Sequence, residues 1–513
     1  MSYLELLKLA APEAIVLVAA LVVLTIGLVT GRRGVGASVS VAGPGNAGDR
    51  PTAFAGETPA APSGRVYPFV AAIGLAFAAA AVLPLPSHAT LFHGMLVISP
   101  LNSLFKIICL TLAFFTVILA RGEHALPNKG EYLAMILLAT IGLLLLVGSE
   151  ELLMIFIGLE LTGLSLYVMT AFDKEHRSSS EAGLKYFLFG SLASAFTLFG
   201  LSFIYGLTGT TTLASIAQRL AAVPIEPLLG AGIVMTLIGF AFKIAAAPFH
   251  LWAPDVYQGA PVSTAAFVAS GSKVASFVVL GKIVLIGFGP VPGSANWHGM
   301  ASGWTLILAV LAALSILIGN LVALAQKNVR RLLAYSAVAH AGYTLVGLVA
   351  AGPLGFSATL FYTTIYGITL VGAFGVVALV RRECGGDDLS DFAGLRTRSP
   401  LLAGCMAIFM LSLAGLPPLA GFFGKFYLFS AAFRAGHNHG LFWLVVLALF
   451  GSLISLYYYL IVLKAIFIDE SNRAFAFPPD YLQRVAITVL AGTVLFLGLM
   501  PETLLARILA SVT

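Results

Sequence analysis

Residues 239–254 read GFAFKIAAAPFHLWAP, and this stretch indicates what kind of fold the chain adopts. Lys243 stands inside an apolar run, and Pro248 follows five residues later. Proline removes a backbone donor and clashes with the preceding turn, so a helix is expected to be interrupted there. Helices that are broken near a buried charge are typical of membrane transport folds. The stretch therefore predicts a membrane helix with a break close to a buried lysine.

The composition of the whole chain agrees with a membrane protein. Hydrophobic residues make up 59% of it and charged residues 10%, whereas a soluble domain is about 25% charged. A membrane span needs about 20 apolar residues, and its backbone must satisfy its own hydrogen bonds in lipid. Apolar runs as long as those in this chain satisfy the backbone hydrogen-bond requirement by forming helices. The predicted fold class is an all-α polytopic membrane protein.

Apolar runs divide the chain into about 14 transmembrane helices. The predicted spans are 12–30, 66–86, 99–120, 130–148, 151–172, 182–207, 227–249, 261–288, 301–324, 330–350, 354–380, 400–433, 440–467 and 482–502. Span seven contains the break at Pro248, and span twelve contains a second at residues 415–421, GLPPLAG. The breaks lie five spans apart, which predicts two five-helix repeats. Because five is odd, the repeats are expected to be inverted. Two unrelated proline kinks are the alternative.

This division gives four regions. Residues 1–129 hold spans one to three and a flexible loop, 31–65, that is rich in Gly, Ala, Pro and Ser. Residues 130–288 form the first repeat and 301–467 the second, and 468–513 hold the C-terminal span.

Basic residues gather in the loops on one side. About 18 Lys and Arg residues fall in the loops after odd-numbered spans, against about 4 on the other side. We therefore expect a multi-pass membrane protein with its basic loops in the cytoplasm and both termini outside, which in a bacterial inner (plasma) membrane is the periplasm. The net charge of +6 is then a property of topology and does not indicate nucleic acid binding.

Four spans carry a charge deep in their apolar sequence: Glu160, Lys243, Lys273 and Lys425. Such charges cost several kcal/mol and usually mark an ion or proton pathway. A protonated lysine cannot bind a metal ion, but a buried lysine can take up and release protons. These residues are the candidate proton-translocating groups.

Each charge has a structural alternative. Glu160 is predicted to form an ion pair with Lys243, and its alternative is a carboxyl held neutral by hydrogen bonds. For Lys243 the alternative is a fixed ion pair that only joins two helices. Small polar neighbours around Lys273 leave room for water, and the alternative for this lysine is an interfacial anchor. Lys425 either exchanges protons or satisfies carbonyl groups freed by the second break.

Two histidines are further candidates. His250 follows the first break and His340 lies within span ten. Histidine titrates near neutral pH and suits a proton relay, although a lone histidine in a membrane helix is often only hydrogen-bonded to a neighbour.

The sequence predicts no cofactor and no metal in this chain. Its three cysteines contain no C-x-x-C, and the Gly34-Val35-Gly36 turn lacks the third glycine of a dinucleotide fingerprint. Sites for NADH, flavin, haem or an iron–sulfur cluster are therefore not visible.

Three motifs carry a resemblance to a known family. They are FHLWAPDVYQGAPVS at 249–263, KNVRRLLAYS at 327–336, and GLPP at 415–418 followed by GKFY at 424–427. Together they resemble the subunit N family of bacterial proton-pumping NADH:quinone oxidoreductase, respiratory complex I, whose mitochondrial counterpart is NADH dehydrogenase subunit 2. The resemblance covers about residues 100–470. Subunits L and M and the multi-subunit Na+/H+ antiporters share the general plan, but the 251–261 run is similar to the N type.

The resemblance implies a 14-span antiporter-like subunit of a membrane arm. It implies that Glu160 and Lys243 form a coupled input pair, that Lys273 is a central relay, and that Lys425 exchanges protons with the other side. Electron transfer from NADH to quinone, with its FMN and iron–sulfur clusters, is expected in partner subunits of a hetero-oligomer. The alternative is an Mrp-type cation/proton antiporter subunit without an electron-transfer partner, and a weaker one is a scaffold held together by its buried charges.

Overall fold

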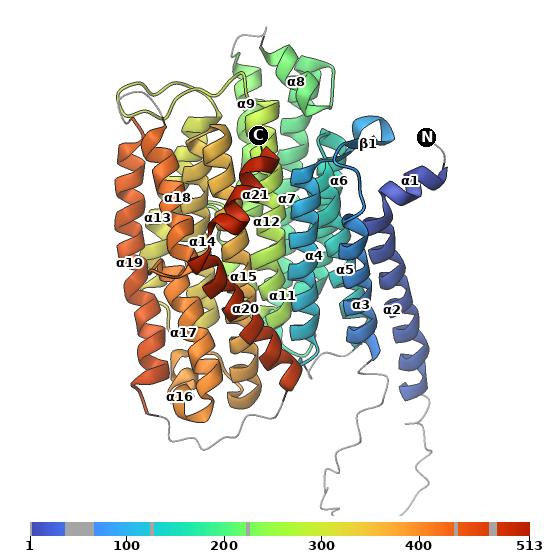
Figure 1. Cartoon of the computed structure of the whole chain (residues 1–513), viewed down its shortest axis with the longest axis vertical. Coiled ribbons are helices and arrows are strands. Elements are labelled where there is room, and N and C mark those ends of the chain that lie inside the picture. Colours follow the sequence, from blue (N-terminus) through green and yellow to red (C-terminus); the bar gives the residue numbers. More distant parts are fainter. Residues whose placement is uncertain are drawn as a thin grey trace, which may run out of the picture.

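Long apolar helices pack side by side along one axis in the computed structural model (Figure 1). The structure describes residues 3–35, 66–123, 128–221, 226–435, 440–470 and 480–512. The helices are α1 Tyr3–Leu9, α2 Ala11–Val35, α3 Val66–Val82, α4 Pro100–Ala120, α5 Lys129–Gly148, α6 Leu152–Thr170, α7 Arg177–Thr208, α8 Leu213–Leu220, α9 Pro227–Lys243, α10 Trp252–Gly259, α11 Val262–Phe267, α12 Lys273–Lys282, α13 Trp304–Ala323, α14 Val329–Val349, α15 Gly352–Cys384, α16 Leu395–Arg398, α17 Pro400–Ala414, α18 Ala420–Arg434, α19 Phe442–Phe467, α20 Tyr481–Leu499 and α21 Glu502–Val512.

The helical membrane class is confirmed. Within the described ranges, 11 helices are long and apolar enough to cross a membrane, and α3, α9 and α17 are shorter apolar helices. A short hairpin, β1 Ala89–Leu91 with β2 Leu96–Ile98, connects α3 to α4. The count of fourteen spans and the inverted relation of the two repeats remain predictions. The predicted loop 31–65 lies outside the described residues from position 36 onward.

The first break is where the proline predicts it. Helix α9 ends at Lys243, Ala245 has a left-handed φ of 59°, and α10 begins at Trp252. Backbone groups freed by the break find partners nearby. The Ala247 N–H donates to Ser315 Oγ at 2.8 Å, and Trp252 Nε1 donates to the Phe242 carbonyl at 3.1 Å. Such replacement partners are what allow a broken helix inside a membrane.

The second break separates α17 from α18. Helix α17 ends at Ala414, and Gly415 follows with φ 87°, a left-handed conformation that glycine adopts without strain. The N–H of Gly421, near the start of α18, donates to Ser412 Oγ at 3.2 Å. The two breaks that the sequence predicts are therefore both present.

A third irregularity was not predicted. The run Val262–Gly287 is one continuous apolar span, but two π-helical turns interrupt its α-helical geometry, η3 at Val268–Ser272 and η4 at Ile283–Gly287. The first of these turns ends directly before Lys273. π-helical turns inside α-helices occur frequently at functional sites.

Burial places α14 and α15 at the centre of the bundle. Almost all of both helices is buried, whereas α2, α7 and α19 expose large apolar side chains. In Figure 1 the short helix α16 lies at the lower end of the bundle, and α8 and β1 lie at the upper end. Lys273 of span eight lies against both of these central helices, and Lys425 of span twelve lies against α14.

Candidate proton-transfer site

Glu160 lies on α6 and is half-buried. Its Oε1 accepts a hydrogen bond from the Ser194 hydroxyl on the neighbouring helix α7. In the part of the chain that the structure describes, no ion pair joins Glu160 to Lys243. The predicted direct pair is therefore not formed in this structure, and Ser194 is the hydrogen-bond partner of the carboxylate instead.

Lys243 is nevertheless held against the same helix, α6. It is the last residue of α9, and its Nζ lies 3.4 Å from the Leu159 carbonyl and 3.5 Å from the Tyr167 hydroxyl. A Cβ added at Gly163 would lie 2.6 Å from that Nζ, so an alanine there would make the end of the lysine side chain shift. Leu159 is adjacent to Glu160 in the sequence, so the lysine and the carboxylate share one stretch of α6 without touching.

Lys273 is the first residue of α12 and is buried. Its Nζ donates to the Ala337 carbonyl of α14 at 2.9 Å and lies 5.6 Å from the centre of the Tyr366 ring on α15. The negative face of an aromatic ring attracts a cation, which offsets part of the cost of burying one. Lys273 thus connects the π-helical turn to the central helices α14 and α15.

His340 lies one turn after Ala337 on α14 and contacts four tyrosines. Its Nδ1 is hydrogen-bonded to the Tyr362 hydroxyl, and its Nε2 lies 2.9 Å from the Tyr459 hydroxyl. Its ring centre lies 5.0 Å from that of Tyr366 and 5.5 Å from that of Tyr343. With both ring nitrogens hydrogen-bonded to hydroxyls, the ring can accept a proton on one nitrogen and release one from the other.

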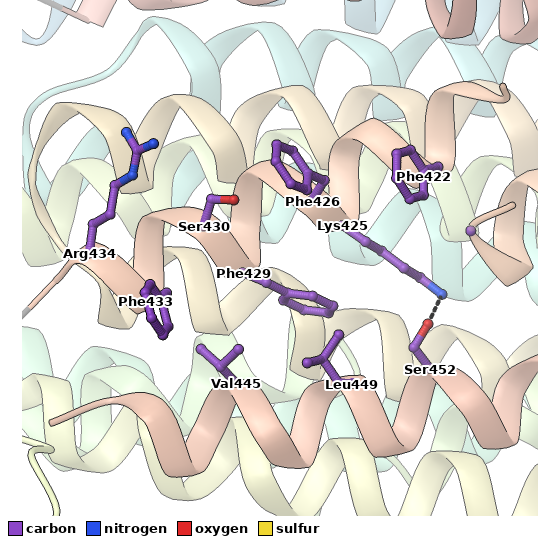
Figure 2. A pocket seen from close by; sticks show the side chains of 11 residues that line it. Phe422, Lys425, Phe426, Phe429, Ser430, Phe433, Arg434, Val445, Leu449 and Ser452 are labelled. Atoms are coloured by element: carbon purple, nitrogen blue, oxygen red, sulfur yellow. Dashed lines mark hydrogen bonds between the residues drawn. The ribbon is translucent and has the colours of Figure 1, made fainter. Parts of the chain in front are cut away.

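Lys425 lies on α18 at the second break. Its Nζ donates to the Ala414 carbonyl at 3.0 Å and to the Ser452 hydroxyl of α19 at 2.9 Å, as Figure 2 shows for the serine. The same ammonium lies 5.1 Å from the centre of the Tyr343 ring. Because Tyr343 also packs against His340, the contacts run from Lys273 through Tyr366, His340 and Tyr343 to Lys425.

A cavity of about 530 Å³ lies beside Lys425. Figure 2 shows the side chains of Phe429 and Phe433 between α18 and α19, and the Lys425 side chain extending toward Ser452. Arg434 lies at the end of α18 and also lines the cavity. The terminal lysine of the contact series therefore borders open space on one side and the packed core on the other.

His250 lies outside this series of contacts. It is buried in the connection between α9 and α10, and its ring packs edge-on against Tyr335 of α14 at 6.3 Å. Its Nδ1 is buried without a hydrogen-bond partner among the described residues. The structure places it between the first break and the central helix.

Two buried lysines are missing from the sequence prediction. Lys106 of α4 pairs with Glu13 of α2 at 2.6 Å. Lys282, at the end of α12, donates to Asn102 Oδ1 at 2.6 Å and to the Val147 carbonyl of α5 at 2.8 Å. Both lysines lie inside predicted spans, at 99–120 and 261–288. A charge within an apolar span is the sequence signal by which they could have been predicted.

Comparison with known proteins identifies the family of this arrangement. The family model described as NADH:quinone oxidoreductase/Mrp antiporter, TM matches residues 149–455, which is more than half of the chain. NADH-quinone oxidoreductase subunit N 2 of Acidobacterium capsulatum is 46% identical over 437 residues, which cover 83% of this chain and 88% of that protein. The chain belongs to the subunit N family of NADH-quinone oxidoreductase. Subunit N of Desulforamulus reducens is 41% identical over 420 residues, covering 82% and 85%.

Solved structures with this subunit N fold agree. A chain in respiratory complex I from Thermus thermophilus with bound aureothin is 32% identical and matches with a TM-score of 0.76, covering 96% of this chain and 98% of that one. A chain of the Mrp complex from Dietzia sp. DQ12-45-1b is 21% identical, with a TM-score of 0.80 and coverage of 99% and 97%. The Mrp likeness shows the shared fold alone.

Proposed function

We propose that this chain moves protons across the membrane as a subunit of an NADH–quinone oxidoreductase. In this proposal the partner subunits of the membrane arm complete a hetero-oligomer, and NADH, FMN, iron–sulfur clusters and quinone belong to those partners. The observation that carries the proposal is the unbroken series of contacts from Lys273 through His340 to Lys425. A scaffold would not require a lysine on each side of a histidine whose two ring nitrogens are both hydrogen-bonded.

The proposed route begins at Glu160 and Lys243. A displacement of α6 against α9 changes the distance between the carboxylate and the ammonium, and therefore changes how tightly each group holds its proton. Lys243 then releases a proton toward Lys273, with His250 in the gap at the first break. His340 passes it on to Lys425, which exchanges with the far side.

The energy required is modest. Moving one charge against 100 mV costs about 2.3 kcal/mol. A change of about two units in the pKa of a lysine corresponds to about 2.7 kcal/mol. Small movements of charges in a low-dielectric interior produce changes of that size.

The proposal includes an orientation and a division of the chain. The basic loops face the cytoplasm and both termini face the periplasm of a bacterial inner membrane. Residues 130–288 and 301–467 act as two proton-handling repeats, with 1–129 and 468–513 on their flanks.

An Mrp-type cation/proton antiporter is the second candidate. The observation that favours it is the fold shared with the Mrp complex from Dietzia. The relatives at 41–46% identity, which are named as subunit N, favour the first candidate. Affinity purification of the chain from its native membrane separates the two. Co-purification of NADH-oxidising subunits supports the oxidoreductase, whereas Na+-dependent exchange by the isolated chain supports the antiporter.

The decisive experiment replaces Lys243 with Ala in the native membrane. NADH-driven acidification of inverted vesicles is recorded together with NADH–quinone turnover in the presence of an uncoupler. We expect acidification to fall at least tenfold, because the input pair loses its proton-carrying member. Lys464→Ala, at the exposed end of α19, is the matched control and should pump normally. Normal pumping by Lys243→Ala in a fully assembled complex would contradict the proposal.

A further inference from the structure

A buried carboxylate lies outside the route described above. Glu123 follows the end of α4, on the face of the molecule that carries the basic loops. Its Oε1 accepts the backbone N–H of Ser263 at 2.6 Å, whereas its Oε2 is buried without a hydrogen-bond partner among the described residues. An unpartnered carboxylate oxygen is costly to bury in its charged form. The group therefore needs a partner that this chain does not supply, and a proton is the simplest one.

Glu123 borders a cavity of about 330 Å³. Asp173, His176 and Arg381 line the same cavity, together with Pro261 at the start of α11. These polar groups belong to the loops and helix ends of the basic face. The cavity brings solvent within reach of the buried carboxylate.

Hydroxyl groups continue inward from the carboxylate. Ser263, whose backbone N–H binds Glu123, carries a hydroxyl that lies 2.7 Å from the Tyr132 hydroxyl of α5. The Tyr132 hydroxyl lies 2.6 Å from Thr264 Oγ1. Ser263, Tyr132 and Thr264 form what we call the hydroxyl chain. The Thr264 hydroxyl in turn donates to the Met169 carbonyl of α6 at 3.3 Å. A hydroxyl can both donate and accept, so a proton taken up at Ser263 can be handed through Tyr132 to Thr264, which passes a proton on when its O–H turns from that carbonyl.

The hydroxyl chain ends on the helix that leads to Lys273. Thr264, the last member of the hydroxyl chain, and Lys273 belong to the same span, nine residues apart, which corresponds to about 14 Å along the helix axis. The small residues of the π-helical turn, Ser270, Gly271 and Ser272, lie between them.

Charges around Glu123 come from three helices. Arg330 of α14 and Arg381 of α15 act on it as cations, and it interacts electrostatically with Lys129 of α5. Burial raises the pKa of the Glu123 carboxyl above its ordinary value, and this effect outweighs the Ser263 hydrogen bonds and the two arginines. A carboxyl with a raised pKa carries a proton over a wider range of pH.

We propose that Glu123 takes up protons from the face with the basic loops and passes them into the hydroxyl chain toward Lys273. This inference rests on the proposed proton-translocating function. It adds a loading group for the central lysine that is independent of the Glu160–Lys243 input.

Three variants in the assembled complex test the proposal. Glu123→Gln removes the exchangeable proton. Ser263→Ala keeps the backbone N–H that Glu123 binds and removes only the hydroxyl, and Tyr132→Phe keeps the ring. We expect each to lower NADH-driven acidification per NADH oxidised by at least half, with normal amounts of assembled complex. Glu175→Gln, an exposed carboxylate on the same face, is the matched control and should be unchanged.

Two outcomes would overturn the inference. One is normal acidification in all three variants. The other is a loss in Glu123→Gln alone, because the carboxylate would then serve only to bind the first turn of α11. Lys273→Ala measured in parallel separates this inference from the function on which it rests. If Lys273→Ala stops pumping while the three variants pump normally, only the loading role fails; if Lys273→Ala also pumps normally, the proposed function fails as well.

Discussion

Lys273 and Lys282 stand on the same helix, and their different surroundings indicate different roles. Among the described residues, the Lys273 ammonium has one hydrogen-bond acceptor, the Ala337 carbonyl, and a tyrosine ring. Lys282 has Asn102 Oδ1 and two carbonyls near the end of α5, with Glu150 at 3.5 Å. A lysine ammonium has three N–H donors. Around Lys282 all three have acceptors, whereas around Lys273 only one does within the described part of the chain. Lys282 therefore stabilises a helix end, whereas Lys273 is suited to losing its proton.

Arginine substitution distinguishes the two lysines, because a guanidinium stays protonated in proteins. Lys273→Arg is expected to reduce NADH-driven acidification of inverted vesicles at least tenfold in an assembled complex. Lys282→Arg keeps a permanent donor at a structural position and is expected to retain more than half of the wild-type acidification. Equal pumping by the two variants would show that proton release from Lys273 is not part of the route.

Helix α6 is the element against which both residues of the proposed input pair lie. Its surface is kept flat at Gly163, where Lys243 rests. Gly163→Ala is expected to displace the ammonium, since a Cβ would lie 2.6 Å from Nζ at the mobile end of the lysine side chain. We expect uncoupled NADH–quinone turnover to fall severalfold. Gly206→Ala on α7, where nothing lies within 4 Å of the added Cβ, is the control and should match wild type.

Helix interruptions differ in how far the sequence predicts them. The breaks at Pro248 and Pro418 are predictable because proline cannot continue a helix. The π-helical turn before Lys273 contains no proline, and its Ser-Gly-Ser sequence is compatible with an ordinary α-helix, so the sequence contains no signal for it. The pairing of Glu160 with Lys243 fails for a related reason. Ser194 of α7 binds the carboxylate, and which neighbour a buried side chain meets depends on packing across several helices.

The Asp387 carboxylate joins the two proposed repeats through Arg330, at the end of the bundle that carries the basic loops. Asp387 binds Arg330 of α14 and, at 2.9 Å, Arg381 of α15. Arg330 in turn donates to the Ala260 carbonyl after α10 at 2.8 Å. Burial alone would raise the pKa of the Asp387 carboxyl, but the two arginines and Asn328 outweigh burial and hold it below its ordinary value.

A lowered pKa sets an acid limit on stability. The stabilisation that the charged Asp387 carboxyl provides is fully present above the unfolded-state aspartate pKa of about 3.9. It is lost as the pH falls through the lower pKa of this carboxyl in the folded state. We expect the chain to dissociate from the purified complex below about pH 4, as measured by the fraction retained after incubation between pH 3 and 7. Asp387→Asn should cost about 3 kcal/mol or more already at pH 7, because Arg330 stays buried without its anion. Asp469→Asn, on an exposed loop, should behave as wild type.

The overall architecture is the part that sequence predicts best. Runs of about 20 apolar residues fix the membrane class, and motifs such as 249–263 indicate the family. The tyrosines around His340 are harder to predict, because Tyr362, Tyr366 and Tyr459 come from two helices far apart in sequence. An aromatic residue in a membrane helix gives no sign of which polar group it will meet.

The hydrogen bond from Lys425 to the Ala414 carbonyl links proton binding to the shape of the second break. Ala414 is the last residue of α17, so any movement of that helix end changes the free energy with which Lys425 binds its proton. Reciprocity requires the converse with equal magnitude, and each proton bound or released pulls on the helix end. In the proposed route, the second break is therefore a transducer that converts mechanical displacement into chemical potential and back.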